Sequence, residues 1–287
     1  MVEVVPMPGP FGAFVDGLDL SQDPGSETMR ELVDGLYRYR ILLFRDQHPD
    51  PAEYARFGRK WGDPIEFFVP TARDRDYPEL IRIGNSPRTP EVARDGAMHW
   101  HADSSYEAVP AAVTMLLAEE APLVGNETLF ADCTAAYEAL PTDMKDRIGD
   151  LHVVHDPNGG KVALDEEVRG GGRHDELPVV THPLVMSHPG TGVTTLYGFS
   201  GTAAGIVGMG EPEAIDLLME IKRHVLQPRF RQQAKADAGT ILMWDNYAVI
   251  HSATPTEYSD EDGKRRLLYR ISTRGLPAVL RSGEPSS

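Results

Sequence analysis

Two histidines and one aspartate, far apart in the sequence, most constrain how this chain can fold. His101 and Asp103 are separated by one residue, and His251 lies far downstream. Residues i and i+2 of a β-strand project from the same face, so this spacing predicts that one strand directs both side chains to one point. A third ligand from a distant strand then closes a triangle on one side of a metal ion. The opposite side of the ion stays open for small molecules.

Composition sets broad limits on the fold and on the partners. The chain has 287 residues, of which 41% are hydrophobic and 25% are charged, and this predicts a globular protein with residues 1–287 in a single domain. A formal net charge of −16 argues against nucleic acid and against an anionic membrane surface, because both reward clustered basic residues. An acidic substrate must therefore meet locally placed arginines.

Cysteine usage favours a reducing compartment. Cys133 is the only cysteine, so no intramolecular disulfide can form. The N-terminal segment has no basic and apolar leader, and the sequence contains no run of about eighteen apolar residues. We expect a cytoplasmic protein.

Hydrophobic periodicity predicts many short strands and a few helices. Predicted strands lie at 11–20, 41–44, 80–83, 111–117, 127–131, 184–186, 194–197, 240–243, 248–250 and 267–272. Predicted helices lie at 25–40 with Ser26 as the cap, and at 50–58, 133–140, 142–148 and 212–225. This order predicts a mainly β, α+β fold with a jelly-roll core of the cupin type, flanked by helices. Two polar segments, 66–97 and 155–175, are predicted to be mobile loops.

The surroundings of the metal-ligand candidates strengthen the pattern. His251 follows two apolar stretches, which predicts a position at the end of a core strand. Further on, Arg266 and Arg270 are four residues apart on a predicted strand and so share a face. Partly buried arginines need anionic partners. An alternative is that ordinary salt bridges satisfy them, from Asp245, Asp260 or Glu261.

Segments 99–141 and 239–270 resemble the taurine and 2,4-dichlorophenoxyacetate dioxygenases. N-terminal segments 17–20, 42–46 and 57–64 align in the same order, so the resemblance covers most of the chain. It implies an Fe(II)- and 2-oxoglutarate-dependent oxygenase on a jelly-roll fold, with O2 as the oxidant. His101, Asp103 and His251 would be the metal ligands. The resemblance further implies that Thr128 and Arg266 hold the distal carboxylate of 2-oxoglutarate.

The same resemblance assigns candidates to the substrate pocket. Arg270 would meet an anionic group of a small substrate, and Ser104 and Tyr106 follow the metal-binding segment. His99 is a candidate for a pocket residue or for a group that orients a metal ligand, and less so for a ligand itself. Phe68 and Phe199 are candidates for pocket walls, with simple core packing as the alternative.

The presence of Asp103 bears on the reaction type. Related halogenases have Gly or Ala at this position, so a carboxylate there favours hydroxylation, desaturation or oxidative cleavage, with release of succinate and CO2. Two other functions stay open: a Zn-dependent hydrolase on a cupin-like barrel, and a binding or storage protein with a structural metal. Thr128 and Arg266 argue against the hydrolase, because hydrolysis needs no second dicarboxylate. The family resemblance also suggests a homo-oligomer.

Overall fold

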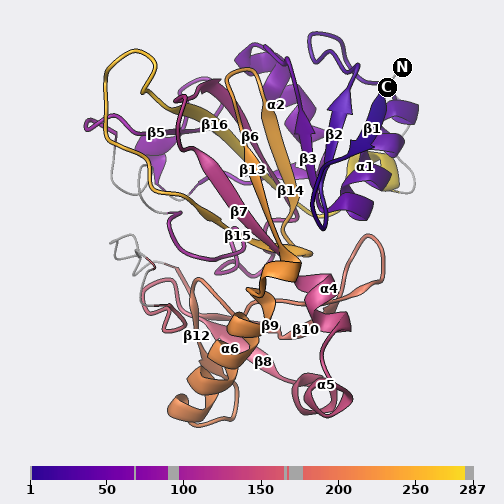
Figure 1. The fold of residues 1–287 in the computed structure, drawn as a ribbon, viewed down its shortest axis with the longest axis vertical. Coiled ribbons are helices and arrows are strands. Elements are labelled where there is room, and N and C mark those ends of the chain that lie inside the picture. Colours follow the sequence, from indigo (N-terminus) through magenta and orange to yellow (C-terminus); the bar gives the residue numbers. More distant parts are fainter. Residues whose placement is uncertain (1, 68, 90–96, 165–166, 168–176, 282–287) are drawn as a thin grey trace.

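Two facing β-sheets form the centre of the molecule (Figure 1). The computed structural model describes residues 2–67, 69–89, 97–164, 167 and 177–281. The larger sheet has the order β1-β2-β3-β14-β6-β16-β4, and β5 pairs with β16 on the same edge as β4. These strands are β1 (Glu3–Pro6), β2 (Ala13–Asp16), β3 (Ile41–Phe44), β4 (Asp63–Pro64), β5 (Ile81–Gly84), β6 (Val113–Glu120), β14 (Ile241–Asp245) and β16 (Leu267–Arg274). The smaller sheet has the order β13-β7-β15, with β7 (Glu127–Asp132), β13 (Arg231–Lys235) and β15 (Val249–Ala253).

The inner faces of the two sheets pack against each other. Leu242, Trp244 and Leu268 of the larger sheet share one buried cluster with Phe130 and Val249 of the smaller sheet. The Phe130 and Trp244 rings meet edge to face, with their centroids 5.6 Å apart. The apolar stretches of β7, β14 and β16 thus form strands because their inward side chains fill the space between the sheets.

Two helices cover the outer face of the larger sheet. Helix α1 (Ser26–Tyr39) and helix α2 (Pro51–Arg59) contribute Leu32, Leu36 and Phe57 to a cluster that includes Met115 and Met243. Asp50 caps α2 through a capping box, and Pro51 occupies its first turn. For α1 the predicted cap is wrong: Gly25 is the N-cap, Ser26 is already helical, and no side chain bonds the first turn.

The middle of the chain covers the outer face of the smaller sheet, below the sandwich in Figure 1. Ala131 and Ile250 on that face join a cluster with Leu217 and Ile221 of the long helix. The helices of this region are α4 (Cys133–Glu138), α5 (Thr142–Ile148) and α6 (Glu211–Val225), and its strands are β8 (His152–His155), β9 (Val180–Pro183), β10 (Val185–Ser187), β11 (Thr194–Leu196) and β12 (Ala203–Ile206). Short 3-10 helices occur at Pro70–Ala72, Pro228–Phe230 and Ala278–Leu280.

The architecture confirms the predicted fold class of a jelly-roll core flanked by helices. The hydrophobic pattern did not predict strand β13, because Arg231–Lys235 is mostly polar and lacks apolar alternation. This segment forms a strand by pairing with β7. Parts of the two predicted mobile loops, residues 68, 90–96, 165–166 and 168–176, lie outside the described residues.

Candidate metal centre and co-substrate site

His101 and His251 lie side by side because their backbones pair directly. The amide of each donates to the carbonyl of the other, at 2.9 Å in both directions, in an isolated antiparallel bridge at the edge of β15. Directly paired residues of antiparallel strands point their side chains to the same face. The two imidazole rings accordingly stand with their centroids 4.3 Å apart. His251 lies in the middle of β15 rather than at its end.

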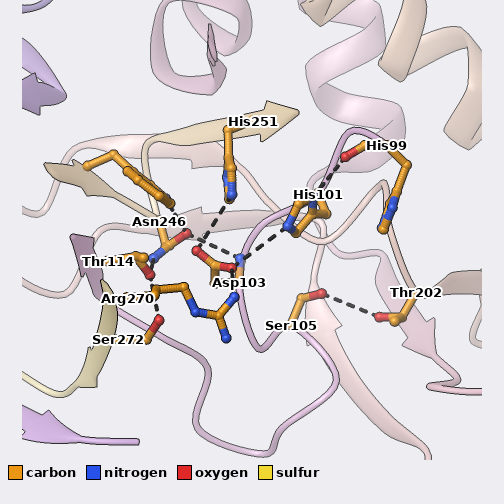
Figure 2. Close-up of polar contacts among 11 residues, drawn as sticks. His99, His101, Asp103, Ser105, Thr114, Thr202, Asn246, His251, Arg270 and Ser272 are labelled. Carbon is orange, nitrogen blue, oxygen red and sulfur yellow. Dashed lines mark hydrogen bonds and ion pairs between the residues drawn. The ribbon is translucent and has the colours of Figure 1, made fainter. Parts of the chain in front are cut away.

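Asp103 joins the two histidines from a turn, which corrects the prediction that one strand carries both His101 and Asp103. His101 is in the bridge, whereas residues 103–106 form a turn in which Ser104 has a φ of 52°. The Asp103 carboxylate lies 3.7 Å from His101 Nε2 through Oδ1 and 3.6 Å from His251 Nε2 through Oδ2. One ligand atom from each residue lies within 4.8 Å of the others (Figure 2).

Neighbouring groups orient these side chains. His101 Nδ1 lies 2.7 Å from the His99 carbonyl, and a proton on Nδ1 leaves the lone pair of Nε2 directed to the centre. Asn246 accepts from the Asp103 amide at 3.2 Å, and its own amide donates to Thr114 Oγ1 at 2.9 Å. Asn246 is 1% exposed. Sequence reasoning missed it, although a polar residue between two apolar strands was a signal.

Electrostatics favour the ligand forms of these side chains. Burial, reinforced by the neighbouring His101, lowers the pKa of His251 to about 3, so its imidazole is neutral near pH 7. Burial opposes ionisation of Asp103, but the nearby His251, His101 and Arg270 outweigh it and hold the pKa of this carboxyl well below its ordinary value. The centre therefore offers the neutral imidazole of His251 and the carboxylate of Asp103 beside the imidazole of His101.

This donor set fits a divalent transition metal. Asp103 Oδ2 is buried and has no hydrogen-bond partner among the described residues, which is unusual for a carboxylate oxygen without a bound cation. Two imidazole nitrogens and one carboxylate oxygen are the ligands of the 2-His-1-carboxylate triad, which leaves further positions open.

Arg270 stands beside the metal centre. Its Nη1 lies 3.4 Å from Asp103 Oδ1, and its guanidinium stacks over Phe67 at 5.2 Å from the ring centroid. The alternative acidic partners are engaged elsewhere: Asp245 contacts His188, Asp260 contacts Arg88 and Glu261 contacts Lys264. The charge of Arg270 therefore faces the centre.

Thr128 lies on the inner face of the smaller sheet, and Arg266 immediately precedes β16 of the larger sheet. Thr128 lies on β7 two residues from Phe130, and it pairs with Ala253, two residues beyond His251. On β16, Leu268 packs in the cluster of Phe130, and the pairing of β16 with β6 shifts register between Leu267 and Leu268. Arg266 is 8% exposed, and its Nη1 donates to Thr256 Oγ1 at 3.2 Å.

Of the candidate substrate residues, Ser104 and Tyr106 lie near the centre. Tyr106 hydrogen-bonds Ser104 and interacts electrostatically with Arg270 and Asp103, and burial raises the pKa of its phenol. The His99 ring lies over that of His101, with centroids 4.7 Å apart.

Neither of the two phenylalanine candidates, Phe68 and Phe199, is shown near the metal centre. Phe199 is fully buried in the cluster between the smaller sheet and α6, which supports the alternative of core packing. Phe68 lies outside the described residues.

A close approach of Gly201 fixes the position of His101. Gly201 has a φ of 65°, and a Cβ at this position would stand 2.9 Å from His101 Cβ. The adjacent Thr202 contacts Ser105 at 3.3 Å and His155 Nδ1 at 2.9 Å, and so ties the turn after Asp103 to β8.

Comparison with known proteins decides the family. The family model described as taurine catabolism dioxygenase TauD, TfdA family matches residues 3–272. The chain belongs to this family. It is 31% identical to the (S)-phenoxypropionate/alpha-ketoglutarate-dioxygenase of Sphingobium herbicidovorans, over 96% of each chain.

Solved structures agree with this membership. A putative alpha-ketoglutarate-dependent taurine dioxygenase from Burkholderia xenovorans is 28% identical, covers 96% of this chain and 93% of its own, and superposes with a TM-score of 0.80. AAD-2 in complex with Mn(II) and N-oxalylglycine is 26% identical over 100% of both chains, with a TM-score of 0.78. This TauD/TfdA protein is therefore an alpha-ketoglutarate-dependent dioxygenase. No helix in the described part of the chain has both the length and the apolar character of a membrane span.

Proposed function

We propose that this protein uses Fe(II), O2 and 2-oxoglutarate to hydroxylate a C–H bond of a small anionic substrate, with release of succinate and CO2. The observation that carries the proposal is the convergence of His101, Asp103 and His251, whose ligand atoms lie within 4.8 Å of one another. Iron held by these residues would supply the oxidising chemistry. The chain contributes binding, orientation and exclusion of water. The proposal takes residues 1–287 as one cytoplasmic catalytic domain.

Thr128 and Arg266 are proposed to bind the distal carboxylate of 2-oxoglutarate. A planar guanidinium can pair with a carboxylate through two parallel hydrogen bonds, and a threonine hydroxyl can donate one more. Both side chains are largely buried, and hydrogen bonds in such surroundings are stronger than in water. This recognition also argues against a Zn-dependent hydrolase, which needs no second dicarboxylate.

Arg270 is proposed to recognise the anionic group of the substrate. Its guanidinium contacts the carboxylate of Asp103, one of the proposed metal ligands, and stacks on the ring of Phe67. Ser104, Tyr106 and His99 would add polar contacts. The Sphingobium relative is named for phenoxypropionate, so aryloxyalkanoates are the first class to screen, followed by sulfonates and carboxylated natural-product intermediates. A net charge of −16 disfavours nucleic acid as a partner.

Substrate-stimulated release of succinate tests this function. Purified protein is supplied with Fe(II), 2-oxoglutarate and O2, and succinate is measured for each candidate acid. We expect stimulation by at least one small acid, with one hydroxylated product per succinate. An alkene or a cleaved fragment would instead assign desaturation or oxidative cleavage. Turnover that persists without 2-oxoglutarate, or with Zn(II) in place of Fe(II), would contradict the proposal.

A further inference from the structure

Asn85 is a buried residue whose side chain, among the residues that the structure describes, hydrogen-bonds one distant loop. It follows β5 and is 1% exposed. Its Nδ2 donates to the carbonyls of Glu257 at 2.6 Å and Lys264 at 2.8 Å, and its Oδ1 accepts from the Arg266 amide at 2.7 Å. Its backbone adds two bonds: its amide donates to the Arg266 carbonyl at 3.3 Å, and its carbonyl accepts from the Ser259 amide at 3.1 Å.

The loop that Asn85 contacts connects the two strands of the site. Residues 254–266 run from the end of β15, which carries His251, to the start of β16, which carries Arg270. Within 254–265 only Ser259 is buried, and most of the other side chains are exposed. The loop therefore contributes little apolar packing of its own. Thr254 attaches the start of the loop to Glu127 of β7, and Asn85 holds the middle and the end of the loop.

Asn85 and the loop hold Arg266 at both ends. Asn85 bonds the amide and the carbonyl of the Arg266 backbone, while Thr256 of the loop accepts from the guanidinium. The requirement is specific to an amide, because two donors must face two carbonyls and one acceptor must face an N–H. An aspartate would direct an oxygen at the two carbonyls instead.

We propose that Asn85 is a positioning residue for the 2-oxoglutarate site, which it serves by fixing the backbone and hence the guanidinium of Arg266. This inference rests on the proposed role of Arg266. A bidentate pair depends on alignment, so a small displacement of the guanidinium weakens the bonds to the distal carboxylate. In the described part of the chain, Asn85 makes no hydrogen bond with a metal ligand, and iron binding is expected to be independent of it.

The test is an anaerobic titration of two oxo acids into the Fe(II)-loaded protein, followed by the visible absorption of the iron–oxo acid complex. One is 2-oxoglutarate, and the other is 2-oxopentanoate, which has the same chelating end but no distal carboxylate. Asn85→Asp is expected to weaken 2-oxoglutarate binding about tenfold. Its affinity for 2-oxopentanoate and for Fe(II) should stay within about twofold of wild type. If Asn85→Asp does not fold, the same two titrations are made with Asn85→Ala, for which we expect the same selective loss of 2-oxoglutarate affinity.

Glu261→Gln is the matched control, because it removes an exposed ion pair with Lys264 from the same loop and leaves the bonds of Asn85 in place. It should bind both oxo acids as wild type does. Unchanged 2-oxoglutarate affinity in a folded Asn85 variant would overturn the inference. An equal loss of affinity for both oxo acids would also overturn it, because it would indicate a general structural role. Absence of the absorption band in wild type with iron bound would overturn the proposed function instead.

Discussion

The metal end and the co-substrate end of the proposed site are built in different ways. At the metal end, the backbones of His101 and His251 pair directly, and the Asp103 amide donates to the buried side chain of Asn246. At the other end, Arg266 follows an exposed loop, and the buried side chain of Asn85 bonds both that loop and the Arg266 amide. Backbone pairing places the two histidines, whereas side-chain hydrogen bonds to a loop support the proposed co-substrate site. The two ends are therefore expected to fail separately.

The largest effect is expected at the metal end. Asp103→Ala removes one ligand and leaves Arg270 without its carboxylate partner. Succinate formation should fall by more than about 100-fold, since loss of groups that merely orient ligands already costs about 10- to 100-fold. Asp260→Ala, which removes an exposed partner of Arg88, is the control and should keep full activity. Turnover in Asp103→Ala close to that of wild type would mean that the ligand is misassigned.

Arg266→Lys tests the opposite end. Lysine keeps the charge but cannot form the bidentate pair, so the KM for 2-oxoglutarate should rise about 10- to 100-fold while the affinity for Fe(II) stays unchanged. Steady-state kinetics and a metal titration measure the two quantities. Arg265→Lys changes the neighbouring arginine, which pairs with Glu120, and should have no such effect. Equal losses of iron and 2-oxoglutarate affinity would contradict the separation of the two ends.

Gly201→Ala probes the packing behind His101. The added methyl group would stand 2.9 Å from His101 Cβ at a positive φ, so the imidazole must shift. We expect the affinity for Mn(II), measured by electron paramagnetic resonance, to fall about tenfold. Gly205→Ala, where the structure has open space around the added atom, is the control. Wild-type Mn(II) affinity in Gly201→Ala would show that this contact does not hold the ligand.

The smallest expected effect is on stability. Burial, with a contribution from His182, lowers the pKa of His155 to about 3. Below about pH 6.5, His155 is protonated in the unfolded chain but stays neutral in the folded chain. The free energy of unfolding therefore falls as the pH falls. We expect a loss of about 1 kcal/mol from this group between pH 6.5 and pH 5.5. Thermal unfolding should depend less on pH in His155→Gln than in wild type, and an unchanged dependence would contradict the assignment. His152→Gln, at an exposed position of the same strand, is the control.

The contrast between the two ends of the site also explains which of its residues could be predicted from the sequence. The cluster of His101, Asp103 and His251 was predicted from residue type and spacing, together with the family resemblance. The role of Arg266 was predicted from the resemblance and stays a proposal. The turn that carries Asp103 could not be predicted, because a strand and a turn can both bring residue i+2 to the same metal centre. Asn85 and Asn246 were also missed, since their roles arise from contacts with residues more than one hundred positions away. The position of Asn246 between two apolar strands was a signal in the sequence, whereas nothing in the residues around Asn85 indicated its contacts.

Anaerobic addition of 2-oxoglutarate to the Fe(II)-loaded protein tests the central claim most directly. Chelation of iron by the keto acid at the His101, Asp103 and His251 centre should produce a weak charge-transfer band in the visible region. The band should form at markedly higher 2-oxoglutarate concentrations in Arg266→Lys. A folded, iron-loaded wild-type protein that shows no band at saturating 2-oxoglutarate would contradict the account.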